Sequence, residues 1–287
     1  MYDVSLSTSY FPAQTDAKIW DTTVGVHLRE VAVDHPDRVA MVEIDDAGQA
    51  RGKWTYSNLL VNSDRLARSL ASRFAPGEKV VVWAPNIPEW IFMEYACGLA
   101  GLVLVTANPS FQAKELRYVL EQSGAVALFM VDEFRGNPMR EIAENATASV
   151  EGIREVINLN DEAALHARGD LEGVLPVVAP DDAAQIQYTS GTTGRSKGAE
   201  LTHQGILANA HQANTMIGHL RKSDGDTTLV ILPLYHITAF ALVFVIGITS
   251  GDHLVLVPSP RPPSNLKTAF ENFGVTIFIG INTLFAA

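Results

Sequence analysis

Hydrophobic and polar positions follow two alternating periods along this chain. Apolar runs of strand length, several of them rich in β-branched residues, are separated by longer stretches in which apolar residues recur with helical spacing. This alternation is typical of parallel strands joined by helices, and strands apolar on both faces indicate sheets covered on two sides. The expected strands are Val39–Ile44, Lys79–Ala84, Leu102–Thr106, Ala127–Val131, Glu155–Leu159, Ala184–Tyr188, Thr228–Leu232, Leu254–Val257 and Val275–Ile279.

The segments between these runs carry signals for helix ends. Ser57 is expected to cap a helix that runs to Phe74. Pro88 stands where a first helical turn would begin, because its fixed φ suits that position. Gly124 follows an amphipathic stretch and is placed to end it in a left-handed conformation. The sequence therefore predicts an α/β fold of stacked, mostly parallel sheets with helices on both faces.

Composition excludes some classes of function. The 287 residues carry 32 acidic and 21 basic side chains, a net charge of −11, which argues against a nucleic-acid surface. A local phosphate site remains compatible with this charge, because backbone N–H groups and one or two cations can build it. Cys97 is the single cysteine, so no intrachain disulfide can form, as is typical of a cytoplasmic protein. The apolar stretch Ile237–Ile248 is too short for a membrane span of about 20 residues.

The strongest chemical signal is the segment Tyr188–Gly198, with the sequence YTSGTTGRSKG. It follows an expected strand and precedes a helix that Thr202 can cap. Glycines let the backbone approach a ligand closely, and consecutive N–H groups in such a loop form an anion-binding concavity. Hydroxyl side chains and the ammonium of Lys197 add further donors. The segment therefore predicts a polyphosphate site.

Two other interpretations of this segment are less favoured. A Walker A loop needs Gly, four residues and then Gly-Lys-Ser/Thr, whereas Lys197 is preceded by Ser196 and followed by Gly198. A plain surface turn is also less favoured, because five hydroxyl residues, three glycines and a lysine fall within this one segment.

The segment resembles the phosphate loop of the adenylate-forming superfamily, which contains acyl-CoA synthetases, peptide-synthetase adenylation domains and luciferases. Ser196 stands where the family usually has proline. Further resemblances follow the family's order and are closest to fatty-acyl-CoA ligases. They lie in Asp21–Gly25 with Pro36–Ala40, Trp54–Leu59, Pro85–Trp90, Asn108-Pro109, Glu115-Leu116 and Ser123–Ala125.

This resemblance implies an AMP-forming acid–thiol ligase that uses ATP, Mg²⁺ and coenzyme A. A carboxylate, expected to be a fatty acid, would attack ATP to give an acyl-adenylate, and coenzyme A would then accept the acyl group. Lys197 is the implied catalytic residue and Thr189 the implied metal-assisting residue. The implied nucleotide-binding residues are Thr189, Ser190, Gly191, Thr192, Thr193, Gly194 and Lys197.

A second segment, Leu232–His236, resembles the family's LPLxH stretch. The resemblance implies that Tyr235 and His236 line the acyl-substrate pocket. From the residue alone, His236 would be interpreted as a core histidine bonded to a backbone group. Catalysis by a general base is not implied, since a carboxylate nucleophile is already ionised at neutral pH.

The resemblance also predicts the organisation of the chain. Residues 1–60 would join a second subdomain, 61–220 would form the first α/β subdomain with the phosphate loop, and 221–287 the second. The apolar helix start at 282–287 has no stop signal, and the family's adenine, ribose, metal-binding and C-terminal lysine positions would lie downstream. We therefore expect an incomplete N-terminal domain without the C-terminal lid domain, inactive alone.

Expected partners are a small-molecule carboxylate, ATP and coenzyme A, with no nucleic acid and no transmembrane segment, in the cytoplasm. A homodimer is left open. Two alternatives also stay open. One is another adenylating enzyme, either an aryl-CoA ligase or an adenylation domain that loads a carrier protein. The other is a truncated, non-catalytic module that binds a nucleotide or an acyl group.

Overall fold

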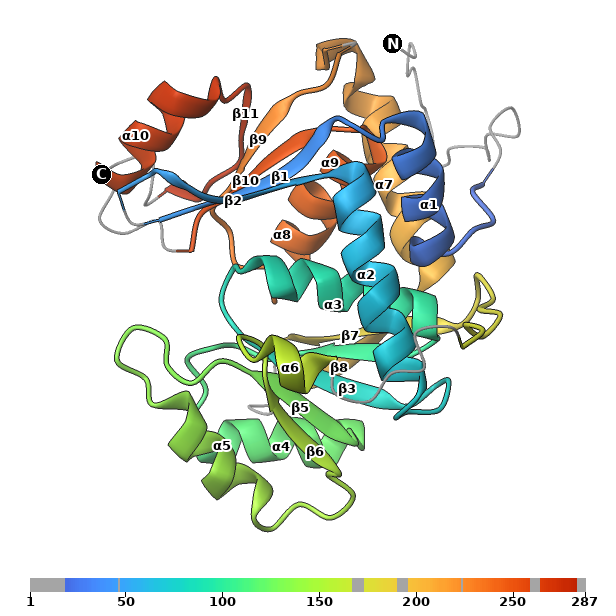
Figure 1. Cartoon of the computed structure of the whole chain (residues 1–287), viewed down its shortest axis with the longest axis vertical. Helices are drawn as coiled ribbons and strands as arrows, with labels where there is room; N and C mark the ends of the chain where they lie inside the picture. The colour runs from blue at the N-terminus through green and yellow to red at the C-terminus, as the bar shows by residue number, and fades with distance from the viewer. Residues whose placement is uncertain are drawn as a thin grey trace, which may run out of the picture.

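The fold stacks two β-sheets and three layers of helices. The computed structural model describes residues 19–45, 47–166, 173–189, 196–222, 224–258 and 264–282. In these ranges the outer helix α10 covers one sheet, a central helical layer separates the two sheets, and α4 and α5 cover the far face of the second sheet (Figure 1). The predicted α/β class with helices on both faces of stacked sheets is confirmed.

The elements have the following bounds. The strands are β1 Val39–Ile44, β2 Ala50–Thr55, β3 Lys79–Trp83, β4 Val103–Thr106, β5 Ala127–Met130, β6 Glu155–Asn158, β7 Ala183–Thr189, β8 Lys197–Thr202, β9 Thr227–Val230, β10 His253–Leu256 and β11 Ile277–Phe278. The helices are α1 Val24–Asp34, α2 Tyr56–Ala71, α3 Pro88–Ala100, α4 Ala113–Ser123, α5 Met139–Thr147, α6 Glu162–Leu165, α7 His203–Ile217, α8 Ile237–Ala239, α9 Ile246–Thr249 and α10 Ser264–Phe273, with a 3₁₀ turn η1 at Gly218–Leu220 and a π-helical segment η2 at Phe240–Val245.

The two sheets are mostly parallel. One has the order β11-β9-β10-β1-β2 and the other β6-β5-β3-β4-β7-β8. In each sheet the antiparallel pairing involves an edge strand, β2 beside β1 and β8 beside β7. Because the other strands run in parallel, their carboxyl ends gather at one edge of each sheet, where ligands commonly bind in open α/β sheets.

Central strands are apolar because both of their faces are covered. Val80, Val81 and Val82 of β3 are fully buried, as are Leu128 and Phe129 of β5. Helices of the central layer pack on one side of this sheet and α4 and α5 on the other (Figure 1). Continuous apolar runs of this kind are what a parallel sheet covered on two sides requires, and these runs therefore predicted their strands correctly.

Several expected helix ends are confirmed. Pro88 is the first residue of α3, and Gly124 ends α4 with φ of 65°. The predicted cap of α2 is wrong. Thr55 rather than Ser57 caps this helix, because its hydroxyl accepts the Asn58 N–H while the Asn58 side chain accepts the Thr55 N–H.

Other expectations near the end of the chain need correction. The apolar stretch Ile237–Ile248 forms three successive helical segments, α8, η2 and α9. The expected buried strand at Val275–Ile279 is the two-residue edge strand β11, whose residues are only half-buried. The expected helix start at 282–287 lies outside the described residues except for Asn282. Among the helices described, none combines the length and the apolar character needed to cross a membrane.

A buried cluster of charges lies at the amino ends of β9 and β10. The Arg221 guanidinium donates to Asp252 and lies 3.9 Å from Asp226, and the three side chains are 11%, 1% and 4% exposed. The Asp226 backbone N–H donates to Asp252, and Thr276 donates to Asp226 over 2.7 Å. This cluster joins the start of two strands to the turn before them and lies at the edge opposite to the predicted site.

Candidate functional site

The predicted phosphate loop connects the two strands of a β-hairpin. Thr189 ends β7 and Lys197 begins β8, and the two residues are direct antiparallel partners. Both side chains are exposed. Directly opposed residues on one face of such a pair have Cβ atoms about 4.5–5.5 Å apart, so the hydroxyl and the ammonium can reach one anionic group. Ser190, Gly191, Thr192, Thr193 and Gly194 lie outside the described residues, and their roles stay predictions.

Helix α4 holds the base of this hairpin. The Tyr118 hydroxyl donates to the Ser196 carbonyl over 2.8 Å, and the Tyr188 hydroxyl donates to the Gln122 side chain. The Tyr118 and Tyr188 rings meet edge to face with centroids 6.5 Å apart. Burial, reinforced by Tyr118, raises the pKa of Tyr188 to about 12, so its hydroxyl remains a donor at neutral pH. These contacts fix both ends of the loop to α4.

Gly198 is required where the hairpin crosses its neighbours. A Cβ at this position would lie 2.8 Å from Cγ2 of Ile186 and 3.4 Å from the Tyr188 ring. A side chain at this position would require Ile186 or the strand itself to shift. The glycine therefore serves hairpin packing, a reason distinct from the close approach to a ligand that its place in the segment suggested.

A row of buried polar side chains leads along β7 toward the loop. Gln185 donates to Glu94 of α3 over 2.8 Å, and Gln187 donates to Gln185 over 2.7 Å. The Thr106 hydroxyl at the end of β4 lies 3.4 Å from the Gln187 side-chain oxygen. Alternate residues of a strand share a face, so Thr189 continues this row into the loop. The apolar pattern predicted the strand Ala184–Tyr188, but it did not indicate that the polar residues Gln185 and Gln187 would be buried.

Glu94 is the buried end of this row. Its side chain is buried and accepts a hydrogen bond from the Gln185 amide. Burial raises the pKa of Glu94 to about 8 in spite of the hydrogen bond from Gln185. The carboxyl is therefore mostly protonated at neutral pH, and the row beneath the loop is mostly uncharged.

The second predicted segment lies at the carboxyl end of β9. Tyr235 is half-buried, and burial raises the pKa of its hydroxyl. His236 is exposed and precedes α8, where its Nδ1 accepts the Thr238 N–H over 3.3 Å. The interpretation of His236 as a core histidine is therefore wrong in its burial, although the ring does bond a backbone group.

Asn86 connects this segment to the other sheet. It follows β3, and its buried side chain bonds the backbone of both Leu232 and Leu234. The carboxyl edge of one sheet therefore lies against the carboxyl edge of the other. Since β7 ends at the same edge as β3, the phosphate hairpin and the segment around Tyr235 belong to one region of the molecule. Asn86 lies in the segment Pro85–Trp90 that carries part of the resemblance, but its long-range contacts to Leu232 and Leu234 have no signature in the sequence.

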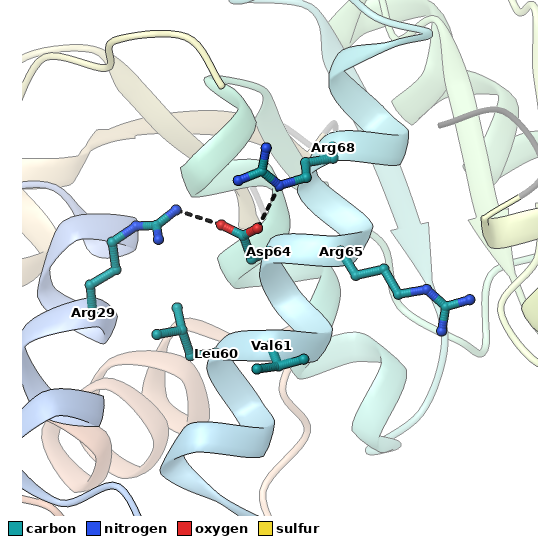
Figure 2. Close-up of a pocket in the computed structure, with 6 residues that line it drawn as sticks. All are labelled: Arg29, Leu60, Val61, Asp64, Arg65 and Arg68. Carbon is teal, nitrogen blue, oxygen red and sulfur yellow. Dashed lines mark hydrogen bonds and ion pairs between the residues drawn. The ribbon is translucent and has the colours of Figure 1, made fainter. Parts of the chain in front are cut away.

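A surface pocket of about 400 Å³ lies between α1 and α2, away from this region (Figure 2). Its arginines Arg29 and Arg68 both donate to Asp64 over 2.6 Å, while Arg65 points away and pairs with Glu162. Although burial opposes ionisation, the hydrogen bonds from Arg68 and Arg29 hold the pKa of Asp64 below its ordinary value. The positive charges of the pocket are thus already paired, and the arrangement joins two helices.

The described residues contain no group of three or more His, Cys, Asp or Glu side chains placed to hold a metal ion. Thr189 offers one hydroxyl oxygen at the start of the loop. A magnesium ion there would have to take its remaining ligands from elsewhere, since it prefers six oxygen ligands.

Comparison with known proteins identifies a family and related sequences for this chain. The sequence pattern of the family described as "AMP-binding enzyme" matches residues 28–287. A long-chain-fatty-acid–CoA ligase of Escherichia coli O6:H1 is 30% identical over 239 residues, which cover 74% of this chain and 43% of the ligase. The mitochondrial medium-chain acyl-CoA ligase ACSF2 of Rattus norvegicus is 28% identical, covering 96% of this chain and 49% of the rat protein. The chain thus spans about half the length of these curated relatives.

Solved structures share the fold. The N-terminal domain of FACL13 from Mycobacterium tuberculosis superposes with a TM-score of 0.80 at 23% identity, covering 92% of this chain and 64% of that one. An O-succinylbenzoate coenzyme A synthetase from Bacillus subtilis, in complex with ATP and magnesium, gives 0.73 at 22% identity, covering 93% and 66%. The sheets and helical layers described above are therefore those of acyl-CoA ligase N-terminal domains.

Proposed function

This chain belongs to the AMP-binding enzyme family, and we propose that it is the phosphate-binding part of an AMP-forming ligase that activates a fatty acid. In the proposed reaction the acid's carboxylate attacks the α-phosphorus of ATP and displaces pyrophosphate. The thiol of coenzyme A then attacks the acyl-adenylate and displaces AMP. The names of the relatives, long-chain and medium-chain acyl-CoA ligases, favour a fatty acid over an aryl acid or an amino acid.

The observation that carries this proposal is the pairing of Thr189 with Lys197 at the base of the loop. The ammonium supplies charge that attracts the β- and γ-phosphates, and the hydroxyl supplies a donor or a metal ligand. Transfer of a phosphorus centre needs positioning and charge neutralisation more than covalent help from the protein. Both residues are exposed, so an incoming triphosphate can reach them.

Magnesium would complete this arrangement by neutralising charge on the triphosphate and its leaving group. Thr189 is the proposed ligand from the described part of the chain, and phosphate oxygens and water would fill other positions. Tyr235 and His236 are proposed to line the acyl pocket, on the grounds that their segment lies at the same carboxyl edges as the hairpin.

Pyrophosphate exchange tests the proposal directly. We expect the full-length gene product to exchange labelled pyrophosphate into ATP in the presence of a fatty acid. Aryl acids and amino acids should support less exchange, because the proposed pocket accepts an alkyl chain. The 287-residue chain alone should give no exchange above background, since it spans only about half of its relatives.

Each alternative has its own outcome in this assay. Preference for an aryl acid or an amino acid would indicate another adenylating enzyme. Nucleotide binding without exchange for any acid would indicate a binding module. Acid-dependent exchange by the 287-residue chain would contradict its proposed inactivity.

A further inference from the structure

Asn86 makes two hydrogen bonds that cross between the sheets. Its amide nitrogen donates to the Leu232 carbonyl over 2.9 Å, and its amide oxygen accepts the Leu234 N–H over 2.8 Å. The residue is 5% exposed and Leu234 is 1% exposed. Both bonds join residues more than 140 positions apart in sequence. Asn86 therefore satisfies the buried Leu234 N–H and the partly buried Leu232 carbonyl.

The chemistry of a primary amide suits this position. The segment presents one acceptor and one donor on either side of Pro233, which has no N–H of its own. Asparagine offers a donor and an acceptor from one short planar group, whereas an ionised carboxylate only accepts. Leaving either backbone group unpaired would incur its full desolvation cost.

On its own side, Asn86 stands close to the start of a helix. It lies in the short connection between β3 and α3, just before Ile87, whose extended backbone precedes the proline that begins the helix. On the other side the segment continues into Tyr235 and His236. The amide thus fixes the backbone immediately before the two proposed pocket residues.

We propose that Asn86 is a positioning residue that holds the Leu232–His236 segment in the geometry needed to bind the acyl substrate. The inference rests on the proposed function and names a residue through which the pocket is built. Asn86 acts through the backbone of the segment, and no contact with the substrate is required of it.

Steady-state kinetics of the full-length gene product separate this role from a general loss of stability. Asn86→Ala should raise the KM for the fatty acid by roughly tenfold, as expected from the loss of one buried and one partly buried hydrogen bond. The KM for ATP should change by less than about twofold, because the phosphate hairpin is anchored separately through α4. Asn214→Ala is the matched control, since the Asn214 amide also bridges two elements, α7 and α9, without contacting the segment.

The Asn86→Asp variant supplies a signature that a structural role would not produce. An ionised aspartate would accept from Leu234 but repel the Leu232 carbonyl, so the fatty-acid KM should rise near neutral pH. Protonation restores a donor beside the acceptor. The ratio of the variant's KM to that of the wild type should therefore fall toward one as the pH is lowered, while the ratio for Asn86→Ala stays constant.

Hydrogen exchange measures the clamp, meaning the two hydrogen bonds from Asn86 to Leu232 and Leu234, without depending on activity. The amide of Leu234 should exchange at least about tenfold faster in Asn86→Ala than in the wild type, because its acceptor is gone. Asn214→Ala should leave that amide protected. If the wild type had no acid-dependent activity, the proposed function would fail while this result still tested the clamp.

Three results would overturn the inference. One is an unchanged fatty-acid KM in Asn86→Ala together with faster exchange at Leu234. Another is an equal rise in KM for ATP and for the fatty acid. The third is a rise of the same size in Asn214→Ala, which would assign the effect to stability alone.

Discussion

Replacing Glu94 with glutamine should make the protein more stable, and the gain should grow as the pH rises. The Glu94 carboxyl is fully buried, and its pKa is raised from 4.5 to about 8. Glutamine keeps the oxygen that accepts from Gln185 and supplies an N–H where the protonated acid has its O–H. The variant therefore keeps the polar row and removes the titration.

The sign of this effect follows from the proton count. Between pH 4.5 and about 8 the unfolded chain has released the Glu94 proton while the folded protein still holds it. The wild type therefore loses stability as the pH rises through this interval, and Glu94→Gln does not. At about 1.4 kcal/mol per pKa unit, the difference should reach roughly 4 kcal/mol near pH 8 and vanish near pH 4.5.

Urea unfolding at several pH values measures this difference. Glu121→Gln, at an exposed position of α4, is the control for removal of a carboxylate and should give a curve parallel to the wild type. Parallel curves for Glu94→Gln and the wild type would show that the Glu94 carboxyl titrates normally in the folded protein.

Arg221→Ala should destabilise the protein by about 3–5 kcal/mol, because it leaves two buried carboxylates without their cation. Asp252 and Asp226 are 1% and 4% exposed. Burial already raises the pKa of Asp252 despite the hydrogen bond from Arg221, and removal of the guanidinium would raise it further. The cost should appear in the free energy of unfolding from urea titration.

Arg65→Ala provides the matched comparison. Arg65 pairs with Glu162 over 3.1 Å, but the two side chains are 45% and 78% exposed. An exposed pair of this kind contributes at most about 1 kcal/mol. Equal losses of stability in the two variants would mean that the Arg221 cluster is solvated and contributes no more than a surface pair.

Most of the predicted strands are buried on both faces, and the exceptions are the edge strands β6 and β11. Continuous apolar runs such as Val80–Val82 identify them without any alternation. The two strands that it missed, β2 and β8, are antiparallel edge strands with largely exposed, polar residues. Each of them pairs with the strand across a hairpin, and the hydrophobic pattern of a strand does not indicate such a pairing. For β8 this meant that the phosphate loop was expected to lead into a helix directly.

Helix caps are local and could partly be predicted from the sequence, whereas contacts between distant segments could not. The capping pair Thr55 and Asn58 follows a known spacing and could have replaced Ser57 in the prediction. The bond from Tyr118 to Ser196 and the clamp formed by Asn86 join distant segments through backbone groups. A backbone carbonyl or N–H has no signature in the residue that carries it, so these contacts needed the fold.

The most direct test is to replace Lys197 with alanine in the full-length gene product. The measured quantity is kcat/KM for ATP in pyrophosphate exchange driven by a fatty acid. Lys267→Ala, an exposed lysine on α10 with its side chain 79% exposed, is the control. We predict that Lys197→Ala lowers kcat/KM for ATP by about 100-fold, as loss of a donor at developing charge does elsewhere, and that Lys267→Ala leaves it unchanged. An unchanged kcat/KM for ATP in Lys197→Ala would contradict the claim that this hairpin holds the polyphosphate.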